Sequence, residues 1–299
     1  MDILLQTDKV NKVYKNTRAL KNVSMTIYRG DIYGFIGENG AGKSTMIRVI
    51  TGVNKPTSGH FTLNISKRLG AMAAIVESPA LHNGLNAMNN LRVQCDLLNL
   101  QKTDAELLDL LAHVGLEDQQ FSKKAAKNFS LGMKQRLSIA LALLGNPEFI
   151  LLDEPMNGLD PVGIKDMREL ILKLNRENGT TFLISSHILN ELDKVATKYG
   201  FISHGELIEE ISNRELHAKA KSVTKIVLLN PLSAEVTALL SSYRYEVQDQ
   251  KTLLVNDEKD GQKVFQLLMG NGVEVSSFDV ERESIEDYYL KTVKKGVRA

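Results

Sequence analysis

Up to residue 208, segments with the hydrophobic pattern of strands alternate with segments that have the pattern of helices. Short apolar runs predict strands at residues 25–28, 32–36, 69–76, 149–152 and 180–184, and helices are predicted at residues 43–50, 85–98 and 161–177. This alternation favours an α/β layer architecture. The run at 149–152 is wholly apolar, which is typical of a strand buried in a parallel sheet.

Turn and cap residues sharpen the boundaries of these elements. Thr103 and Glu106 form a capping-box pattern that opens a further helix, and Gly115 is a suitable place for that helix to end. The pair His204-Gly205 interrupts an apolar stretch at residues 202–208, which predicts a hairpin.

The pattern changes near residue 220. Beyond it we expect strands at residues 225–229, 245–248, 252–255 and 273–278, and helices at residues 233–241, 259–269 and 284–293. The order β-α-β-β-α-β matches a small α+β, ferredoxin-like unit. We therefore expect two domains, residues 1–218 and 222–299. The second contains no catalytic constellation, and two roles stay open for it: a regulatory or dimer-stabilising module, or a small-molecule sensor.

Composition limits the classes of function. With 43% hydrophobic and 24% charged residues, the chain of 299 residues can build a proper core. The net charge of +1 gives no sign of nucleic-acid binding. Cys95 is the single cysteine, so no disulfide partner is expected, and its helical spacing with Leu91 makes it a core residue. No apolar run reaches the ~20 residues of a membrane span, and residues 1–10 lack the core of a signal peptide.

Residues 37–44, GENGAGKS, fit the P-loop pattern between a predicted strand and a predicted helix. Glycines let backbone N–H groups surround phosphate oxygens, and the helix N-terminus adds a favourable dipole. Lys43 can bridge the β- and γ-phosphates of ATP, the Ser44 hydroxyl can bind Mg²⁺, and Thr45 can reach the α-phosphate. The residues expected to bind the nucleotide here are Gly37, Asn39, Gly40, Ala41, Gly42, Lys43, Ser44 and Thr45.

Two carboxylates follow the apolar strand at 149–152. Asp153 can lie beside the Mg²⁺ shell, as in other P-loop NTPases. Glu154, one residue further, can take a proton from the attacking water. The alternative is a strand that merely ends in acidic turn residues. The P-loop upstream argues against this alternative.

Residues 129–137, FSLGMKQRL, resemble the signature loop of the ABC ATPases, commonly written LSGGQ. Other matches follow in family order: an aromatic at Tyr14, a Q-loop position at Glu77, a D-loop at residues 157–160 and a switch histidine in Ser186-His187. The resemblance covers about residues 1–215. It implies an ABC-type nucleotide-binding domain with a helical signature subdomain.

The resemblance also implies site residues and an assembly. Outside the P-loop, the implied nucleotide contacts are Tyr14 on adenine, Ser130 and Gly132 on the γ-phosphate, and Asp160 in the D-loop. Glu154 and His187 would be catalytic, and Ser44, Asp153 and Glu77 would hold Mg²⁺. Two copies would pack head to tail, with each ATP between the P-loop of one copy and the Ser130 loop of the other. Tyr14 and His187 each have an ordinary structural alternative, and Ser130 also suits a helix N-cap.

Departures from the common pattern point to a subgroup. Leu131 and Met133 replace Gly and Gln in the signature loop, and Glu77 replaces the usual Gln. This combination, with the C-terminal extension, is similar to the bacitracin-resistance and lantibiotic-immunity type. It implies a separate polytopic permease, export of an antimicrobial peptide or antibiotic, and a place in the cytoplasm at the inner face of the cell membrane. Glu77 is either a charged Mg²⁺ ligand or a tolerated near-isostere of Gln.

The rival function is that of a soluble ABC ATPase acting on ribosomes or DNA. Ribosome-acting members usually carry two cassettes in one chain, whereas this sequence has one P-loop. Chromosome-acting members insert a long coiled coil, and no sustained heptad tract occurs here. The near-neutral charge also argues against nucleic acid as a partner.

Overall fold

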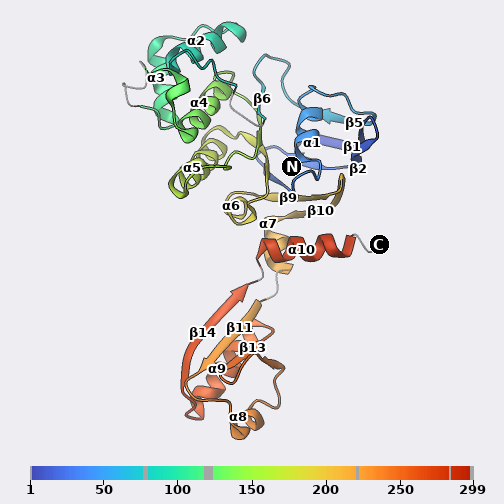
Figure 1. The fold of residues 1–299 in the computed structure, drawn as a ribbon, viewed down its shortest axis with the longest axis vertical. Helices are drawn as coiled ribbons and strands as arrows, with labels where there is room; N and C mark the ends of the chain where they lie inside the picture. The colour runs from blue at the N-terminus through green and yellow to red at the C-terminus, as the bar shows by residue number, and fades with distance from the viewer. Residues whose placement is uncertain (1, 77–79, 118–123, 220–221, 283, 297–299) are drawn as a thin grey trace. The chain divides into compact units, whose positions relative to one another are not determined.

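The structure is a computed structural model, and it describes residues 2–76, 80–117, 124–219, 222–282 and 284–296. Tertiary contacts divide the chain into two compact units, one of Met1–Asn213 with Thr292–Ala299 and one of Arg214–Lys291 (Figure 1). The division falls near the boundary expected from sequence, except that the last residues group with the first unit.

The central sheet of the first unit has six strands among the described residues. Their order is β10 (Glu206–Ser212), β9 (Lys198–Ser203), β4 (Ile32–Ile36), β8 (Thr181–Ser186), β7 (Phe149–Asp153) and β6 (Met72–Ile75). All neighbouring pairs are parallel except β9 and β10. The five parallel strands therefore end at the same edge of the sheet, and the expected α/β architecture is confirmed.

A second, antiparallel sheet packs with the first. It consists of β1 (Ile3–Tyr14), β2 (Thr17–Val23), β3 (Thr26–Tyr28) and β5 (Ser58–Leu63). Leu5 and Leu20 of this sheet share a hydrophobic core with Tyr33, Ile47 and Leu151. Sequence reasoning did not identify β1, β2 or β5, because their apolar and charged residues alternate only in part across bulged pairings.

Four helices of the first unit begin and end close to where the sequence predicts: α1 (Lys43–Ile50), α2 (Ala87–Leu97), α3 (Asp104–His113) and α5 (Pro161–Asn178). The unit also contains α4 (Leu131–Leu143) and α6 (Leu189–Asp193), and α7 (Asn213–Lys219) begins at the boundary with the second unit. Helices α2, α3 and α4 contact one another and form a helical subdomain at one end of the unit (Figure 1). The capping box of Thr103 and Glu106 is present, and Cys95 is buried on α2.

Two local predictions differ in outcome. The predicted strand at 69–76 is shorter than expected, because Gly70 adopts a φ of +78° and only Met72–Ile75 continues as β6. The predicted hairpin is confirmed between β9 and β10. Its turn residues His204 and Gly205 have φ values of +50° and +83°, the positive values that match the twist of paired strands.

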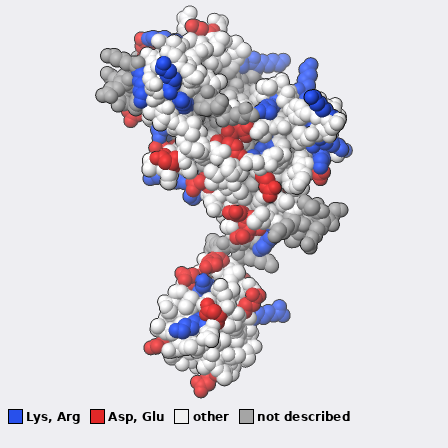
Figure 2. Space-filling model, in the orientation of Figure 1, with Lys and Arg blue, Asp and Glu red and all other residues white. Residues whose placement is uncertain are grey.

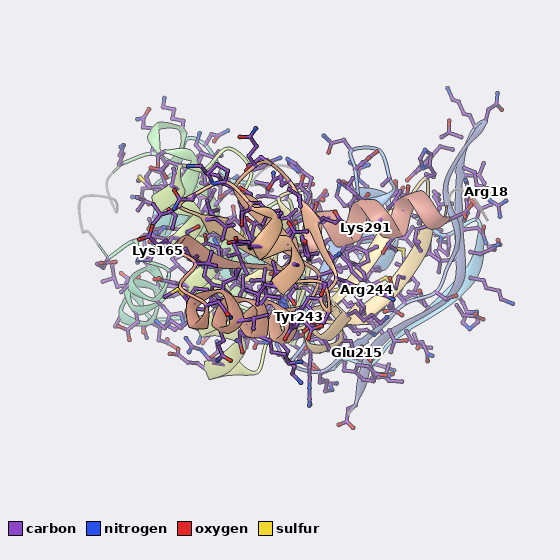
Figure 3. The ribbon with its side chains drawn as sticks, turned by 90° about the horizontal axis from the view of Figure 1, so that it is seen from below. Arg18, Lys165, Glu215, Tyr243, Arg244 and Lys291 are labelled. Carbon is purple, nitrogen blue, oxygen red and sulfur yellow. The ribbon has the colours of Figure 1, made fainter. Side chains whose placement is uncertain are left out.

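The second unit has the element order expected from sequence. Its elements are β11 (Ser222–Leu228), α8 (Ala234–Leu239), β12 (Tyr245–Val247), β13 (Thr252–Val255), α9 (Glu258–Gly270) and β14 (Val275–Arg282), followed by α10 (Ile285–Gly296). The strands form an antiparallel sheet in the order β12-β13-β11-β14. Ile226, Leu253 and Val264 belong to its separate hydrophobic core. Tyr243 and Arg244 lie on the segment that enters β12 (Figure 3).

Candidate functional site

The register of the parallel strands brings three loops together at one edge of the sheet. Ile36 pairs with Ser186, and Asp153 pairs with Ser185. The P-loop after β4, the carboxylates at the end of β7 and His187 after β8 therefore meet at the carboxyl edge. Ligands of parallel α/β sheets bind at this edge.

The P-loop connects β4 to α1 through glycines that no other residue could replace without strain. Gly40 and Gly42 have φ values of +83° and +112°. A Cβ on Gly37 would lie 2.4 Å from the carbonyl oxygen of Ile202. The loop therefore holds its backbone close to the neighbouring chain and keeps a conformation that glycine adopts with little strain.

The N-terminus of α1 lacks a capping side chain, because its N-cap is Gly42. The N-termini of α2, α3, α4 and α5 are each capped by the residue before the helix: Asn86, Thr103, Ser130 and Asp160, respectively. The first amides of α1 are thus left without a side-chain acceptor from the N-cap, in the arrangement by which helix N-termini bind phosphate. Ser44 and Thr45 lie half-buried in its first turn.

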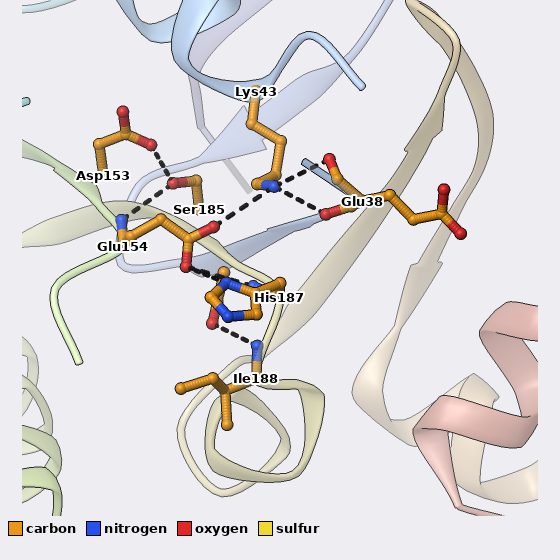
Figure 4. Close-up of polar contacts among 9 residues, drawn as sticks. Glu38, Lys43, Asp153, Glu154, Ser185, His187 and Ile188 are labelled. Atoms are coloured by element: carbon orange, nitrogen blue, oxygen red, sulfur yellow. Dashed lines mark hydrogen bonds and ion pairs between the residues drawn. The ribbon is translucent and has the colours of Figure 1, made fainter. Parts of the chain in front are cut away.

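Lys43 is buried and its ammonium group has three oxygen partners. Nζ donates to the carbonyl oxygens of Gly37 at 2.7 Å and Glu38 at 3.2 Å (Figure 4). It also forms an ion pair with Glu154 Oε1 at 3.3 Å. Glu154 Oε1 has no hydrogen bond in the described structure, so the ion pair lacks hydrogen-bond geometry. Lys43 and Glu154, far apart in sequence, are therefore directly coupled.

Asp153 and Glu154 differ in conformation although they are adjacent. Asp153 is the buried last residue of β7, and its Oδ1 accepts a hydrogen bond from Ser185 Oγ. Glu154 has a φ of +52°, in the left-handed region that non-glycine residues rarely occupy. Such conformations cluster at functional sites, because the surrounding structure must hold them.

Glu154 also contacts His187. Its Oε2 lies 2.8 Å from His187 Nδ1 and accepts a weaker hydrogen bond from the His187 backbone N–H at 3.3 Å (Figure 4). Because Oε1 faces Lys43 and Oε2 faces His187, the Glu154 carboxylate lies between the two. The predicted residues Lys43, Asp153, Glu154 and His187 are thus brought together at one site.

Ser130, Gly132 and Asp160 meet at a different place. They line a pocket of about 510 Å³ together with Leu131, Met133, Gly158 and Leu159, and none of the residues lining it belongs to the P-loop or the Glu154 group. Ser130 Oγ caps α4 by accepting from Met133 N at 3.2 Å, and Asp160 Oδ1 caps α5 by accepting from Gly163 N at 2.9 Å. The N-cap role expected for Ser130 is confirmed.

Two further predicted residues lie apart from these clusters. Tyr14, at the end of β1, is 37% exposed, and its hydroxyl accepts a hydrogen bond from Asn54. Its ring has Lys12 Nζ at 5.0 Å from the centroid. Glu77, the expected Mg²⁺ ligand, lies outside the described residues.

The residues present fit a magnesium nucleotide. Gly37–Gly42 and the uncapped α1 supply amide donors for phosphates, and Lys43 supplies a buried cation. Ser44 and Asp153 supply the oxygen ligands that Mg²⁺ prefers. Over the described part of the chain no group of three or more His, Cys, Asp or Glu residues could hold a metal without such a nucleotide.

Sequence reasoning missed Ser185. Its signal is a hydroxyl residue at the carboxyl end of an otherwise apolar strand, directly before Ser186-His187. The hydroxyl matters only once the register sets Ser185 opposite Asp153.

Two further observations concern the distribution of charged side chains and the length and polarity of the helices. Acidic and basic side chains are interspersed over the face drawn in Figure 2. Among the described residues, none of the helices combines the length and the apolar character that crossing a membrane requires.

Comparison with known proteins gives consistent results. Residues 20–157 match the ABC transporter family. The chain is 37% identical over 306 residues to the bacitracin transport ATP-binding protein BcrA of Bacillus licheniformis, covering 99% of each chain. It is 42% identical over 211 residues to the lantibiotic transport ATP-binding protein SrtF of Streptococcus pyogenes, covering 69% of this chain and 90% of that one.

Solved structures share the fold of the first unit. The cbiO1 protein of Clostridium perfringens, part of an ABC transporter complex, matches with a TM-score of 0.64 and 26% identity, covering 73% of this chain and 92% of that one. A dimeric ATP-binding cassette in a post-hydrolysis state with ADP and phosphate matches with a TM-score of 0.63 and 27% identity, covering 70% and 99%. The chain therefore belongs to the ABC transporter ATP-binding proteins, ATPases that hydrolyse ATP for transport.

Proposed function

We propose that the chain energises a separate polytopic permease by hydrolysing MgATP at the carboxyl edge of its central sheet. The observation that carries this proposal is the Glu154 carboxylate held between Lys43 and His187, beside the P-loop. A carboxylate next to a phosphate-binding loop is the arrangement needed to take a proton from an attacking water.

Each of the expected site residues has its own role. The amides of the P-loop and Lys43 bind the phosphates, Tyr14 stacks on adenine, and Glu154 accepts the proton of the water. His187 orients Glu154 and responds to the γ-phosphate. Ser44, Asp153 and Glu77 hold Mg²⁺, which neutralises charge on the phosphates.

Two copies act together, packed head to tail. The pocket at Ser130, Gly132 and Asp160 supports this arrangement, because it joins a helix N-terminus to the D-loop at a place separate from the P-loop. A helix N-terminus attracts anions, so this pocket suits the γ-phosphate held by the other copy. The related ATP-binding cassette with ADP and phosphate is itself a dimer.

The transported molecule is an antimicrobial peptide or antibiotic, and the transport is export. This part of the proposal rests on the relatives named for bacitracin and lantibiotic transport. The chain works in the cytoplasm, peripherally on the inner face of the cell membrane, because ATP is cytoplasmic and the permease that it energises lies in the membrane.

Purification from membranes tests the proposal. The tagged chain, extracted in detergent, is expected to retain a polytopic membrane protein in stoichiometric amount and to show Mg²⁺-dependent ATPase activity. Recovery of ribosomes or DNA in place of a membrane protein would favour the soluble ABC ATPase instead.

A further inference from the structure

Ser185 is a wholly buried serine whose hydroxyl joins the two adjacent carboxylate residues. Its side chain is 0% exposed. Ser185 Oγ donates to Asp153 Oδ1 and accepts from the backbone N–H of Glu154 at 3.1 Å (Figure 4). Both partners lie at the end of β7, whereas Ser185 lies on β8.

The backbone of Ser185 reinforces this contact. Its carbonyl oxygen also accepts from the Glu154 N–H at 3.1 Å, so this single amide is shared between the side chain and the main chain of Ser185. The parallel register of Asp153 with Ser185 makes the arrangement possible. A hydroxyl is a donor and an acceptor at once, so serine satisfies both partners where an apolar residue satisfies neither.

The restrained residue is the one with unfavourable backbone geometry. Glu154 has a φ of +52°, and such a conformation costs about 1–3 kcal/mol unless the surroundings hold it. The direction of the Glu154 side chain, between Lys43 and His187, depends on this backbone conformation. The bond to Asp153 engages Oδ1, which leaves the other oxygen of that carboxylate for a metal ion.

We propose that Ser185 is a positioning residue that sets the Asp153 carboxylate for Mg²⁺ and the Glu154 peptide for proton transfer. This inference rests on the proposed ATPase role of the same site. Ser185 acts through its two neighbours and does not itself touch the reacting atoms. Its removal therefore weakens metal binding and turnover while leaving the P-loop contacts with ATP intact.

The test compares Ser185→Ala with Ser185→Thr and with Ser138→Ala. The control residue, Ser138, is also a buried serine, but among the described residues its hydroxyl bonds to the Lys134 carbonyl within its own helix, α4. We expect Ser185→Ala to lower kcat about tenfold or more and to weaken Mn²⁺ binding in the ATP complex, measured by electron paramagnetic resonance, by a similar factor, the scale of one hydrogen bond to a charged group. Binding of ATP without metal should change less than about twofold. Threonine, which keeps the hydroxyl, should restore both properties.

Folding is followed by thermal unfolding of each variant. If Ser185→Ala does not fold, Ser185→Cys replaces it, because a thiol has nearly the same size but is a weak donor. The inference is overturned if the Ala or Cys variant matches Ser138→Ala in Mn²⁺ binding and kcat, or if threonine fails to rescue a folded protein. Failure of the wild-type protein to hydrolyse ATP would instead refute the proposed function itself.

Discussion

Two helix N-termini of the first unit differ in whether a side chain caps them. Helix α1 begins after Gly42 and has no capping side chain, whereas α4 begins after Ser130, whose hydroxyl accepts from Met133 N. An uncapped N-terminus can receive several phosphate oxygens on its amides. A capped N-terminus keeps its dipole but presents a hydroxyl, so it is suited to a single additional contact.

The charged residues near the two N-termini differ as well. Beside α1 lie Lys43 and the Glu154 carboxylate, which together can bind phosphate and accept a proton. On α4 itself, the cation Arg136 is paired with Asp166 and donates to the carbonyl oxygen of Val114. The buried cation and the carboxylate at the α1 end support the proposal that this end carries the reaction, whereas the capped α4 end suits the recognition of phosphate.

The largest expected effect comes from removing the base at the α1 end. Glu154→Gln should lower kcat by about 10²-fold or more, the scale of a lost general base, while ATP still binds. The variant should also remain in an ATP-bound dimer detectable by gel filtration. A rate within a few-fold of the wild type would remove Glu154 from this role.

The α4 end is tested by comparing two serine caps. Ser130 and Ser233 each cap a helix by accepting from a backbone N–H at 3.2 Å, but Ser233 caps α8 in the second unit. Alanine at either position should cost about 1 kcal/mol of unfolding free energy. Only Ser130→Ala should also lower ATPase activity, by about tenfold or more, because only there is a hydrogen bond to phosphate lost. Equal activity of the two variants would make Ser130 a structural cap alone.

A smaller effect is expected at Tyr14, the residue proposed to stack on the adenine base. Tyr14→Ala should raise the Kd for ATP about five- to tenfold, since stacking of a base on an aromatic ring is worth ~1–3 kcal/mol. Tyr14→Phe keeps the ring and loses only the hydrogen bond from Asn54, so its Kd should stay near the wild-type value. Unchanged Kd in both variants would leave Tyr14 an ordinary half-exposed aromatic.

The smallest effect is expected at Glu148, which precedes β7 at the edge opposite Glu154. Hydrogen bonds from Ser66 and Arg29 lower the pKa of Glu148 from 4.5 to about 2. Its contribution to stability is therefore present above pH 4.5 and is lost as the pH falls towards 2. Glu148→Gln should lower the unfolding free energy by up to about 1 kcal/mol at pH 7, less at pH 3, and leave ATPase activity unchanged. A loss that is equal at both pH values would contradict this assignment.

The sequence predicted some features of the site and not others, for a physical reason. The P-loop and the position of Asp153 and Glu154 depend on local signals: glycines that allow positive φ, and an apolar strand that ends in carboxylates. The contact of Lys43 with Glu154 and the hydroxyl bridge of Ser185 depend on the register of strands distant in sequence, which single residues do not reveal. The positive φ of Glu154 is likewise a feature that its residue type does not reveal.

The proposed head-to-tail dimer requires that one copy supplies the α1 end and the other copy the α4 end of each ATPase site. Lys43→Ala disables the first end, and Ser130→Arg fills the second with a bulky side chain, so each variant alone should be inactive. Mixed in equal amounts, they should recover up to about a quarter of the wild-type rate, because half of randomly paired dimers hold one intact site of two. A mixture no more active than the separate variants, although mixed dimers are shown by affinity tags to have formed, would contradict the claim.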